Sequence, residues 1–78
     1  MTGRQPEKLP ALSGADILKA LKKAGFEPKG QRGDHVKVRH PGTNRTVIVP
    51  LYDDIADYLL GSILRQAGLT RVEFASCL

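Results

Sequence analysis

The chain has 78 residues, a net charge of +4 and a pI of about 9.6, which suits one small domain with a single core and one surface site. The basic balance favours nucleic acid, an acidic protein or an anionic lipid as partner, without choosing among them. This length leaves no room for a separate cofactor domain, and the single cysteine, Cys77, excludes an internal disulfide and a cysteine-based zinc site.

The N-terminal segment is predicted to lie outside the folded domain. Pro6 and Pro10 lack the backbone N–H that a helix needs, so residues 1–12 are expected to form a disordered or loosely ordered tail before a domain at 13–78. No long apolar run and no apolar core of a secretion signal are present, so we expect a cytoplasmic protein that does not cross a membrane.

A first helix is predicted to begin after Ser13. Ser13 suits an N-cap, and Asp16 lies in the first turn, where a negative charge is favourable. The segment has one apolar stripe and a lysine-rich outer side, formed by Ile17, Leu18, Leu21 and Ala24 and by Lys19, Lys22 and Lys23 respectively. Gly25 suits the position after the helix because glycine adopts positive φ easily.

Three strands are predicted to follow. Residues 26–32 contain Pro28 and Gly30, which weaken a central strand, so this segment is expected at an edge of the sheet. Residues 46–49 are rich in β-branched side chains, and a turn at 41–44 would pair them with the preceding strand as a hairpin.

The middle strand, residues 35–39, alternates clearly. Val36 and Val38 take one face, whereas His35, Lys37 and Arg39 take the other. The preceding Gly-Asp pair is expected to form a tight turn between the first two strands. This pattern predicts a buried apolar face and an exposed basic face.

The last third is predicted to be helical and to end at Gly68. Asp53 or Asp54 is expected to cap it, although Gly61 costs about 1 kcal/mol relative to alanine and leaves open a start after Tyr58. Thr70 and Glu73 have the spacing of a capping box, which predicts a final short helical turn. The sequence therefore predicts a small α+β domain of the order α-β-β-β-α, with two helices on one face of a three-stranded antiparallel sheet.

The candidate functional residue is His35, one of two histidines, which follows Gln-Arg-Gly-Asp at residues 31–34. Histidine can take up or release a proton near neutral pH, and cations on the same strand face can hold phosphates. On spacing alone, His35 is better interpreted as a surface histidine without a role. The basic side chains on the same strand face favour a functional role only somewhat more. His40, before Pro41, is interpreted as a turn residue rather than a second catalyst.

Three segments resemble the HicA family of bacterial toxins, the small mRNA interferases of type II toxin–antitoxin systems. The segments are Leu-Lys-Lys-Ala-Gly-Phe at 21–26, Gln-Arg-Gly-Asp-His at 31–35 and Ser-Ile-Leu-Arg-Gln-Ala-Gly-Leu at 62–69, with Val-Pro-Leu at 49–51 between them. The resemblance implies a fold similar to the double-stranded-RNA-binding domain and metal-independent mRNA cleavage that depends on His35. It also implies a HicB-like antitoxin that masks the site, and no cofactor or metal.

The expected site extends from this histidine. Gly33 and Asp34 form the active-site turn in the place of the family's Gly-Ser. Lys37 and Arg39 are expected to bind RNA phosphates, and Arg32 and Lys29 are weaker candidates because their strand is irregular. RNA carries its own nucleophile, the 2′-OH, which the histidine could deprotonate, or the histidine could instead protonate the leaving oxygen. Asp34 either favours the imidazolium form or is a turn residue that points away.

The chain departs from the family pattern in a second place. Residues 52–61 lack the usual basic side chains and carry Asp53, Asp54 and Asp57. This change keeps two alternatives open, a non-catalytic RNA-binding module derived from the toxin and a protein-interaction domain.

Overall fold

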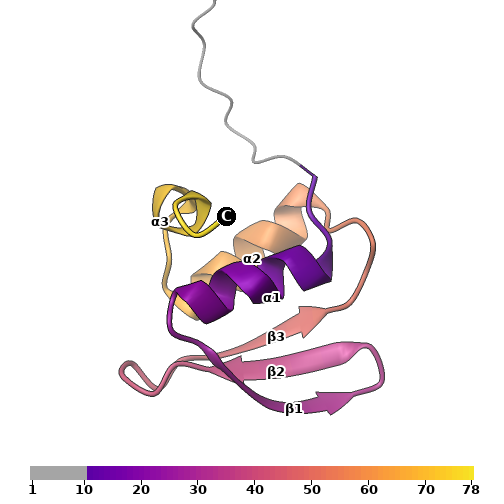
Figure 1. Cartoon of the computed structure of the whole chain (residues 1–78). Helices are drawn as coiled ribbons and strands as arrows, with labels where there is room; N and C mark the ends of the chain where they lie inside the picture. The colour runs from indigo at the N-terminus through magenta and orange to yellow at the C-terminus, as the bar shows by residue number, and fades with distance from the viewer. Residues whose placement is uncertain (1–10) are drawn as a thin grey trace, which may run out of the picture.

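The computed structural model describes residues 11–78, so most of the predicted tail lies outside the described residues. The elements are α1 (Gly14–Lys23), β1 (Glu27–Arg32), β2 (His35–Arg39), β3 (Thr46–Pro50), α2 (Asp57–Ala67) and α3 (Arg71–Ala75). The strands form one antiparallel sheet in the order β1-β2-β3. α1 and α2 lie together on one face of the sheet, and no described element covers the other face (Figure 1). The predicted α+β architecture is confirmed.

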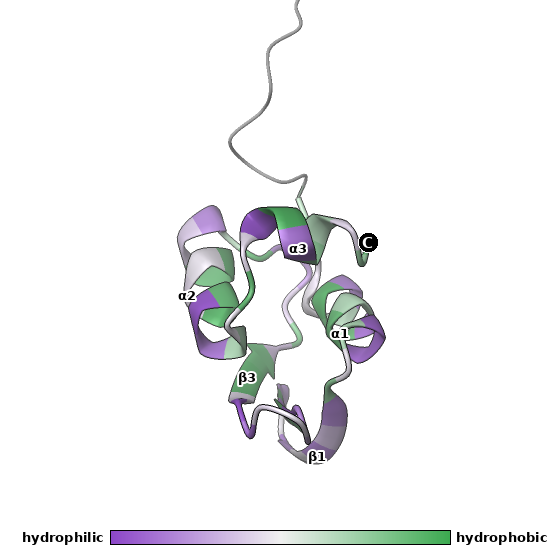
Figure 2. Cartoon of the chain, turned by 90° about the vertical axis from the view of Figure 1, so that its left-hand side faces the viewer, coloured by the Kyte–Doolittle hydropathy of each residue, from purple (hydrophilic) through white to green (hydrophobic). Residues whose placement is uncertain are grey.

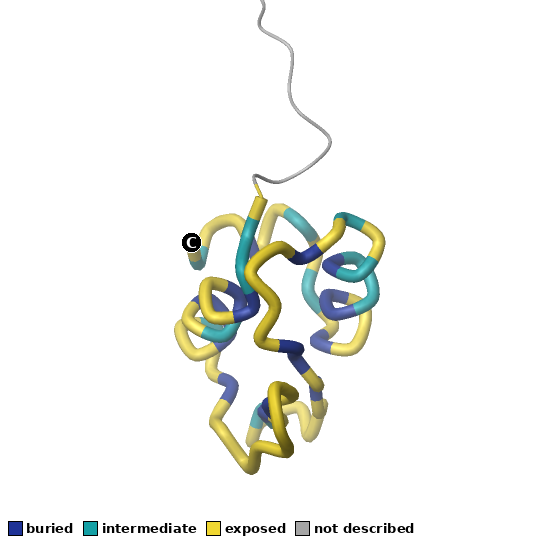
Figure 3. The backbone as a smooth tube through the Cα atoms, turned by 90° about the vertical axis from the view of Figure 1, so that its right-hand side faces the viewer, coloured by how far each residue is buried: buried dark blue, intermediate teal, exposed yellow. Residues whose placement is uncertain are grey.

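The hydrophobic core lies between the sheet and the helices. The inward-facing strand residues are Val36, Val38, Val47 and Val49, and the largest helical contributions are Ile17, Leu21, Ile63 and Phe74. Burying one such side chain stabilises the fold by about 1.5–3 kcal/mol. The apolar sides of α1 and α2 face each other across this core, while their polar sides face outwards (Figure 2). Exposed residues run along β1 and its turns without interruption, whereas buried and exposed residues alternate along the helices (Figure 3).

The ends of α1 are determined locally, as the sequence predicts. The Ser13 hydroxyl accepts a hydrogen bond from the Asp16 N–H at 3.1 Å, and the Asp16 carboxylate accepts one from the Ser13 N–H at 3.1 Å. The latter bond holds the pKa of Asp16 below its ordinary value. Gly25 follows the helix with φ of 104°, a backbone conformation that other residues rarely adopt.

The start of α2 differs from the prediction. Its N-cap is Ala56, which makes no side-chain capping bond, so the expected caps at Asp53 and Asp54 are wrong, and so is a start after Tyr58. A tertiary contact explains the difference: the Ile55 N–H donates to the carbonyl of Leu12 at 2.8 Å. This bridge keeps the chain extended up to the residue before the helix.

A second tertiary contact stabilises the first turn of α2. Asp57 receives two hydrogen bonds from the guanidinium of Arg71 in α3, at 3.1 and 3.3 Å. A Cβ atom at Gly61 would lie 3.5 Å from the same guanidinium, an ordinary van der Waals distance, so a small side chain fits there. α3 itself begins with the predicted capping box of Thr70 and Glu73.

Gly14 brings the start of α1 against the end of β3. A Cβ atom there would lie 1.9 Å from the carbonyl oxygen of Pro50, so only glycine fits. The Gly14 N–H donates to the carbonyl of Tyr52 at 2.9 Å. Because Pro50 pairs with His35 across the sheet, this contact places the start of α1 and the chain after β3 beside the candidate histidine.

β1 is the exposed edge that its sequence predicts. All six of its residues are exposed, and its pairing with β2 is interrupted by an irregularity between Pro28 and Gly30. The tight turn that follows contains Gly33 with φ of 59°. The register then places Arg32 opposite His35 and Gly30 opposite Lys37, which brings the two strands' polar residues onto one face.

Candidate active site

His35 begins β2 on the face of the sheet that the helices leave uncovered. Its neighbour Val36 points into the core, and its own side chain is 48% exposed. The ring atom Nδ1 lies 3.0 Å from the carboxylate oxygen Oδ1 of Asp34. Among residues 11–78 no hydrogen-bonding partner is present for the other ring nitrogen, Nε2. Asp34 therefore does not point away from the histidine, and Nε2 is the ring atom open to a substrate.

The histidine is held from the opposite side by the chain that leaves β3. The Leu51 N–H donates to the carbonyl of Asp34 at 2.6 Å, so the turn before His35 is tied to this segment. The ring of Tyr52 meets the ring of His35 edge to face, with centroids 6.2 Å apart and an interplanar angle of 80°. These contacts limit the directions in which the imidazole can turn.

A cleft of about 410 Å³ adjoins the histidine on the uncovered face. Its lining residues come from all three strands: Lys29, Gly30, Gln31, Arg32, His35, Lys37 and Ile48. We call this cleft the basic cleft because three of its side chains are basic. Lys29 lies 3.5 Å from Glu27, whereas no carboxylate lies within ion-pair distance of Arg32 or Lys37 in the described chain. The cleft is suited to an anion of phosphodiester size.

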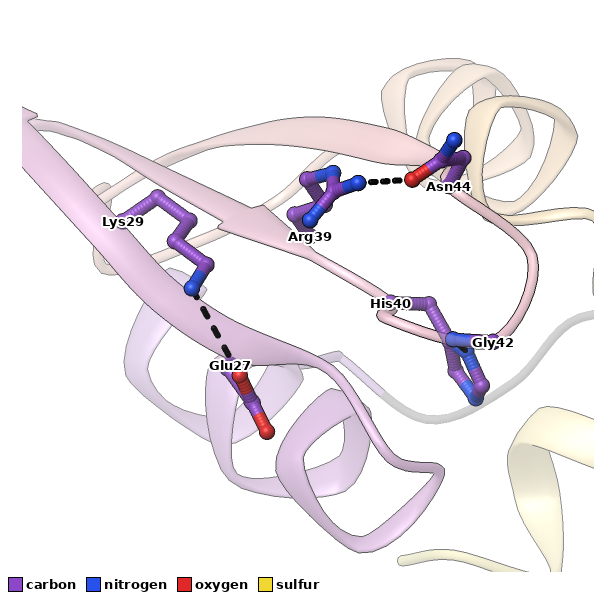
Figure 4. Close-up of polar contacts among 6 residues, drawn as sticks. All are labelled: Glu27, Lys29, Arg39, His40, Gly42 and Asn44. Atoms are coloured by element: carbon purple, nitrogen blue, oxygen red, sulfur yellow. Dashed lines mark hydrogen bonds and ion pairs between the residues drawn. The ribbon is translucent and has the colours of Figure 1, made fainter.

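Arg39 is the one predicted RNA-binding residue that lies outside the basic cleft. It is half-buried, and its guanidinium donates to the side-chain oxygen of Asn44 in the turn before β3. Figure 4 shows Arg39 directed to Asn44, while Lys29 reaches towards Glu27. The structure thus brings His35 together with three of the four predicted RNA-binding residues and separates Arg39 from them.

His40 lies at the far end of β2 and has different surroundings. Its Nδ1 accepts hydrogen bonds from the N–H groups of Gly42 and Thr43 at 3.0 and 3.2 Å. Its ring packs edge to face against Phe26, with centroids 5.2 Å apart. The interpretation of His40 as a turn residue agrees with these contacts, of which Figure 4 shows the one with Gly42.

Two site features escaped the sequence interpretation. Ile48 forms an apolar floor opposite Lys37, and it is 40% exposed. The alternation of Val47, Ile48 and Val49 could have indicated it, because the middle residue must face away from the core. Tyr52 had no such signal, because its position beside His35 depends on the packing of α1 against the end of β3.

No group of three or more histidine, cysteine, aspartate or glutamate side chains within residues 11–78 is arranged to hold a metal ion. No helix in the same range is long and apolar enough to cross a membrane.

A comparison with known protein families shows to which family the chain belongs. A family model described as the HicA toxin of bacterial toxin–antitoxin systems matches residues 14–69, from the first residue of α1 to just beyond α2. The chain belongs to the HicA toxin family. No individual curated protein matches it. Membership makes the protein the toxin of a toxin–antitoxin pair, with an antitoxin as its partner. The order of helices and strands is consistent with the double-stranded-RNA-binding-domain-like fold that the resemblance implies.

Proposed function

We propose that this HicA-family toxin is an endoribonuclease that cleaves mRNA without a metal ion, with His35 as its catalytic residue. The supporting observation is the position of His35 at the rim of the basic cleft, with one ring nitrogen held by Asp34 and the other open. A phosphodiester in the cleft would lie against cations from two strands and within reach of that open nitrogen. Family membership makes RNA the expected polyanion.

The chemistry uses the nucleophile that RNA carries itself. His35 removes the proton from a 2′-OH, the 2′-oxygen forms a bond to the adjacent phosphorus, and the bond from phosphorus to the 5′-oxygen breaks. The 5′-oxygen leaves with the bonding electrons and takes a proton from water. The products are a 2′,3′-cyclic phosphate and a free 5′-OH, and DNA is not cleaved because it lacks the 2′-OH.

The cations of the basic cleft bind and orient the backbone. Lys37 is the central contact, because it follows His35 by two residues on the same strand face and no described carboxylate pairs with it. Arg32 and Lys29 extend the contact along β1, which permits a run of successive phosphates to lie across the sheet. Arg39 contributes less, because its guanidinium is bonded to Asn44.

We also propose that the antitoxin is HicB-like and inhibits by covering this cleft. Carboxylates on its surface would take the places of RNA phosphates on Lys37 and Arg32. A double variant, Lys37→Ala with Arg32→Ala, should then weaken both RNA cleavage and antitoxin binding. Lys22→Ala is the matched control, since Lys22 is an exposed lysine on α1 and lies outside the cleft. Unchanged antitoxin affinity in the double variant would mean that inhibition occurs elsewhere.

An in vitro cleavage assay tests the main proposal. Purified protein should cut single-stranded RNA to products with cyclic phosphate ends, should act equally in EDTA, and should lose activity in His35→Ala. Expression in bacteria should stop growth, and the same substitution should relieve this effect. Loss of cleavage in EDTA would contradict the metal-free mechanism, and an alanine variant that cleaves as fast as the parent would remove His35 from catalysis.

The same assay separates the two alternatives. A non-catalytic RNA-binding module would retain RNA in a salt-dependent manner and yield no products at any protein concentration. A protein-interaction domain would retain no RNA.

A further inference from the structure

The contact between Asp34 and His35 determines where the imidazole carries its proton. A carboxylate at neutral pH has only acceptor oxygens, so Oδ1 of Asp34, 3.0 Å from Nδ1, would repel a bare lone pair there and favours a hydrogen on Nδ1. A neutral imidazole has a single N–H, which leaves Nε2 with a bare lone pair. A base can remove a proton only through such a lone pair, so the carboxylate decides which ring atom can act.

His40 provides the opposite case within the same chain. Its Nδ1 accepts from two backbone N–H groups, and a neutral ring that accepts at Nδ1 must carry its hydrogen on Nε2. The two histidines should therefore be different tautomers in one molecule. The difference arises from their partners, a carboxylate for one and backbone donors for the other.

We propose that Asp34 is a positioning residue, which holds His35 as the Nδ1–H tautomer and so makes Nε2 the base of the reaction. This inference rests on the proposed endoribonuclease function and deepens it, because it decides between the roles of base and acid for the neutral ring. Nε2 is the nitrogen without a described partner, and the ring lines the basic cleft. A 2′-OH next to a phosphate in the cleft would meet the lone pair and not an N–H.

The surrounding chain supports this arrangement. Asp34 is bonded through its carbonyl to the N–H of Leu51 at 2.6 Å, and the ring of Tyr52 lies edge-on to His35. The side chains of the pair are nevertheless 62% and 48% exposed, so solvent weakens their contact. The expected effect is therefore moderate, a change of about fivefold in the tautomer ratio.

The first test measures the tautomers directly by NMR of the full chain labelled with ¹⁵N, at about pH 8.5, where an ordinary imidazole is neutral. A protonated and a bare ring nitrogen differ widely in chemical shift. His35 should show its N–H at Nδ1, and His40 should show its N–H at Nε2 and serve as the internal reference. In Asp34→Ala the ratio for His35 should move towards Nε2–H by about fivefold, with His40 unchanged.

The second test links the tautomer to the reaction. Asp34→Ala should lower kcat by about fivefold to tenfold without raising KM, because it also removes an anion from the approach of the RNA. Asp34→Glu keeps a carboxylate and should recover part of both the rate and the tautomer ratio. Asp54→Asn is the matched control: it removes one exposed negative charge from the neighbouring loop and should leave the tautomer as in the parent. Thermal melting of each variant checks that the turn still folds.

The outcomes separate this inference from the function on which it rests. An unchanged tautomer and an unchanged or higher kcat in Asp34→Ala, in a protein that cleaves RNA, would overturn the role of Asp34 alone. A parent protein with the Nδ1–H tautomer that cleaves no RNA would overturn the proposed function and leave the tautomer assignment standing. A parent His35 with its N–H at Nε2 would overturn the inference whatever its activity.

Discussion

The two ends of β2 carry the two histidines of the chain, and they differ in almost every contact. His35 begins the strand, is half exposed and is held by one carboxylate, that of Asp34. His40 follows the strand, accepts two backbone hydrogen bonds and packs against Phe26. One end of the strand is open at the rim of a basic cleft, and the other is closed by a turn.

The comparison shows that residue type alone does not assign a role to a histidine. At the closed end the ring is enclosed, because it packs edge to face against Phe26 and a Cβ at Gly25 would lie only 2.6 Å from its Nε2. At the open end the backbone is tied down through Asp34 and Leu51, while Nε2 is left without a described partner. We infer that the closed end contributes stability and the open end chemistry.

The largest expected effect comes from replacing each histidine in turn. His35→Ala should lower RNA cleavage by about 10²- to 10⁴-fold, the usual contribution of a general base, and should change stability little. His40→Ala should leave cleavage by the folded protein near that of the parent. It should lower the free energy of unfolding by about 1–2 kcal/mol, because it removes the ring contact with Phe26 and the acceptor of the turn.

Cleavage rates and urea unfolding of the same two preparations check this prediction. The two substitutions should produce opposite patterns, one kinetic and one thermodynamic. A large loss of cleavage in folded His40→Ala protein would show that the closed end takes part in the reaction, and the proposed division between the ends would be wrong.

A smaller effect is expected from two glycines that both have positive φ. Gly25 has φ of 104°, and a Cβ there would lie 2.6 Å from Nε2 of His40, whereas Gly33 has φ of 59° and nothing within 4 Å of such a Cβ. Gly25→Ala should therefore cost about 2–3 kcal/mol, since it combines backbone strain with displacement of the ring. Gly33→Ala should cost only the strain, about 1 kcal/mol.

A double-mutant cycle sharpens this prediction. If the ring of His40 is the obstacle, Gly25→Ala combined with His40→Ala should destabilise by less than the sum of the two single changes. Strict additivity in chemical unfolding would mean that backbone strain alone penalises a side chain at Gly25. The matched control is Gly33→Ala combined with His40→Ala, which should be additive because the two positions share no contact.

Much of the fold was predictable because its signals are local. The Ser13 cap and Gly25 bound α1, and the alternation of Val36 and Val38 assigns the faces of β2. The start of α2 was not predictable, because it depends on the bridge between Leu12 and Ile55, residues far apart in the sequence. The N-cap Ala56 makes no side-chain capping bond, so no local sequence signal indicates where the helix begins.

The candidate site divides in the same way. Strand alternation places His35 and Lys37 on one face, and the hairpin brings Arg32 opposite the histidine. The position of Arg39 outside the basic cleft was not predictable. It depends on a hydrogen bond to Asn44, whose positive φ of 65° belongs to the particular turn that forms. The sequence shows which side chains are basic, but the geometry of the turn determines which of them can contact a ligand.

The smallest expected effect compares these two cations of β2. Lys37→Ala should weaken RNA binding by several-fold at low salt and reduce the slope of log affinity against log salt by about 1, since one phosphate contact is lost. Arg39→Ala should change both quantities less, because its guanidinium is bonded to Asn44 and lies outside the basic cleft. Binding of a non-cleavable 2′-deoxy-substituted RNA, titrated at several salt concentrations, measures both.

Asn44→Ala distinguishes the two explanations for a weak effect at Arg39. If the bond to Asn44 keeps the guanidinium away from the RNA, Asn44→Ala should release it, and the affinity for RNA should rise slightly. The same substitution should not raise the affinity when it is combined with Arg39→Ala. If Arg39 is merely too far from the path of the RNA, Asn44→Ala should leave affinity and salt slope unchanged in both backgrounds. Equal losses from Lys37→Ala and Arg39→Ala would instead mean that the RNA extends beyond the basic cleft to the closed end of β2, and the distinction between the two ends would then apply to catalysis but not to binding.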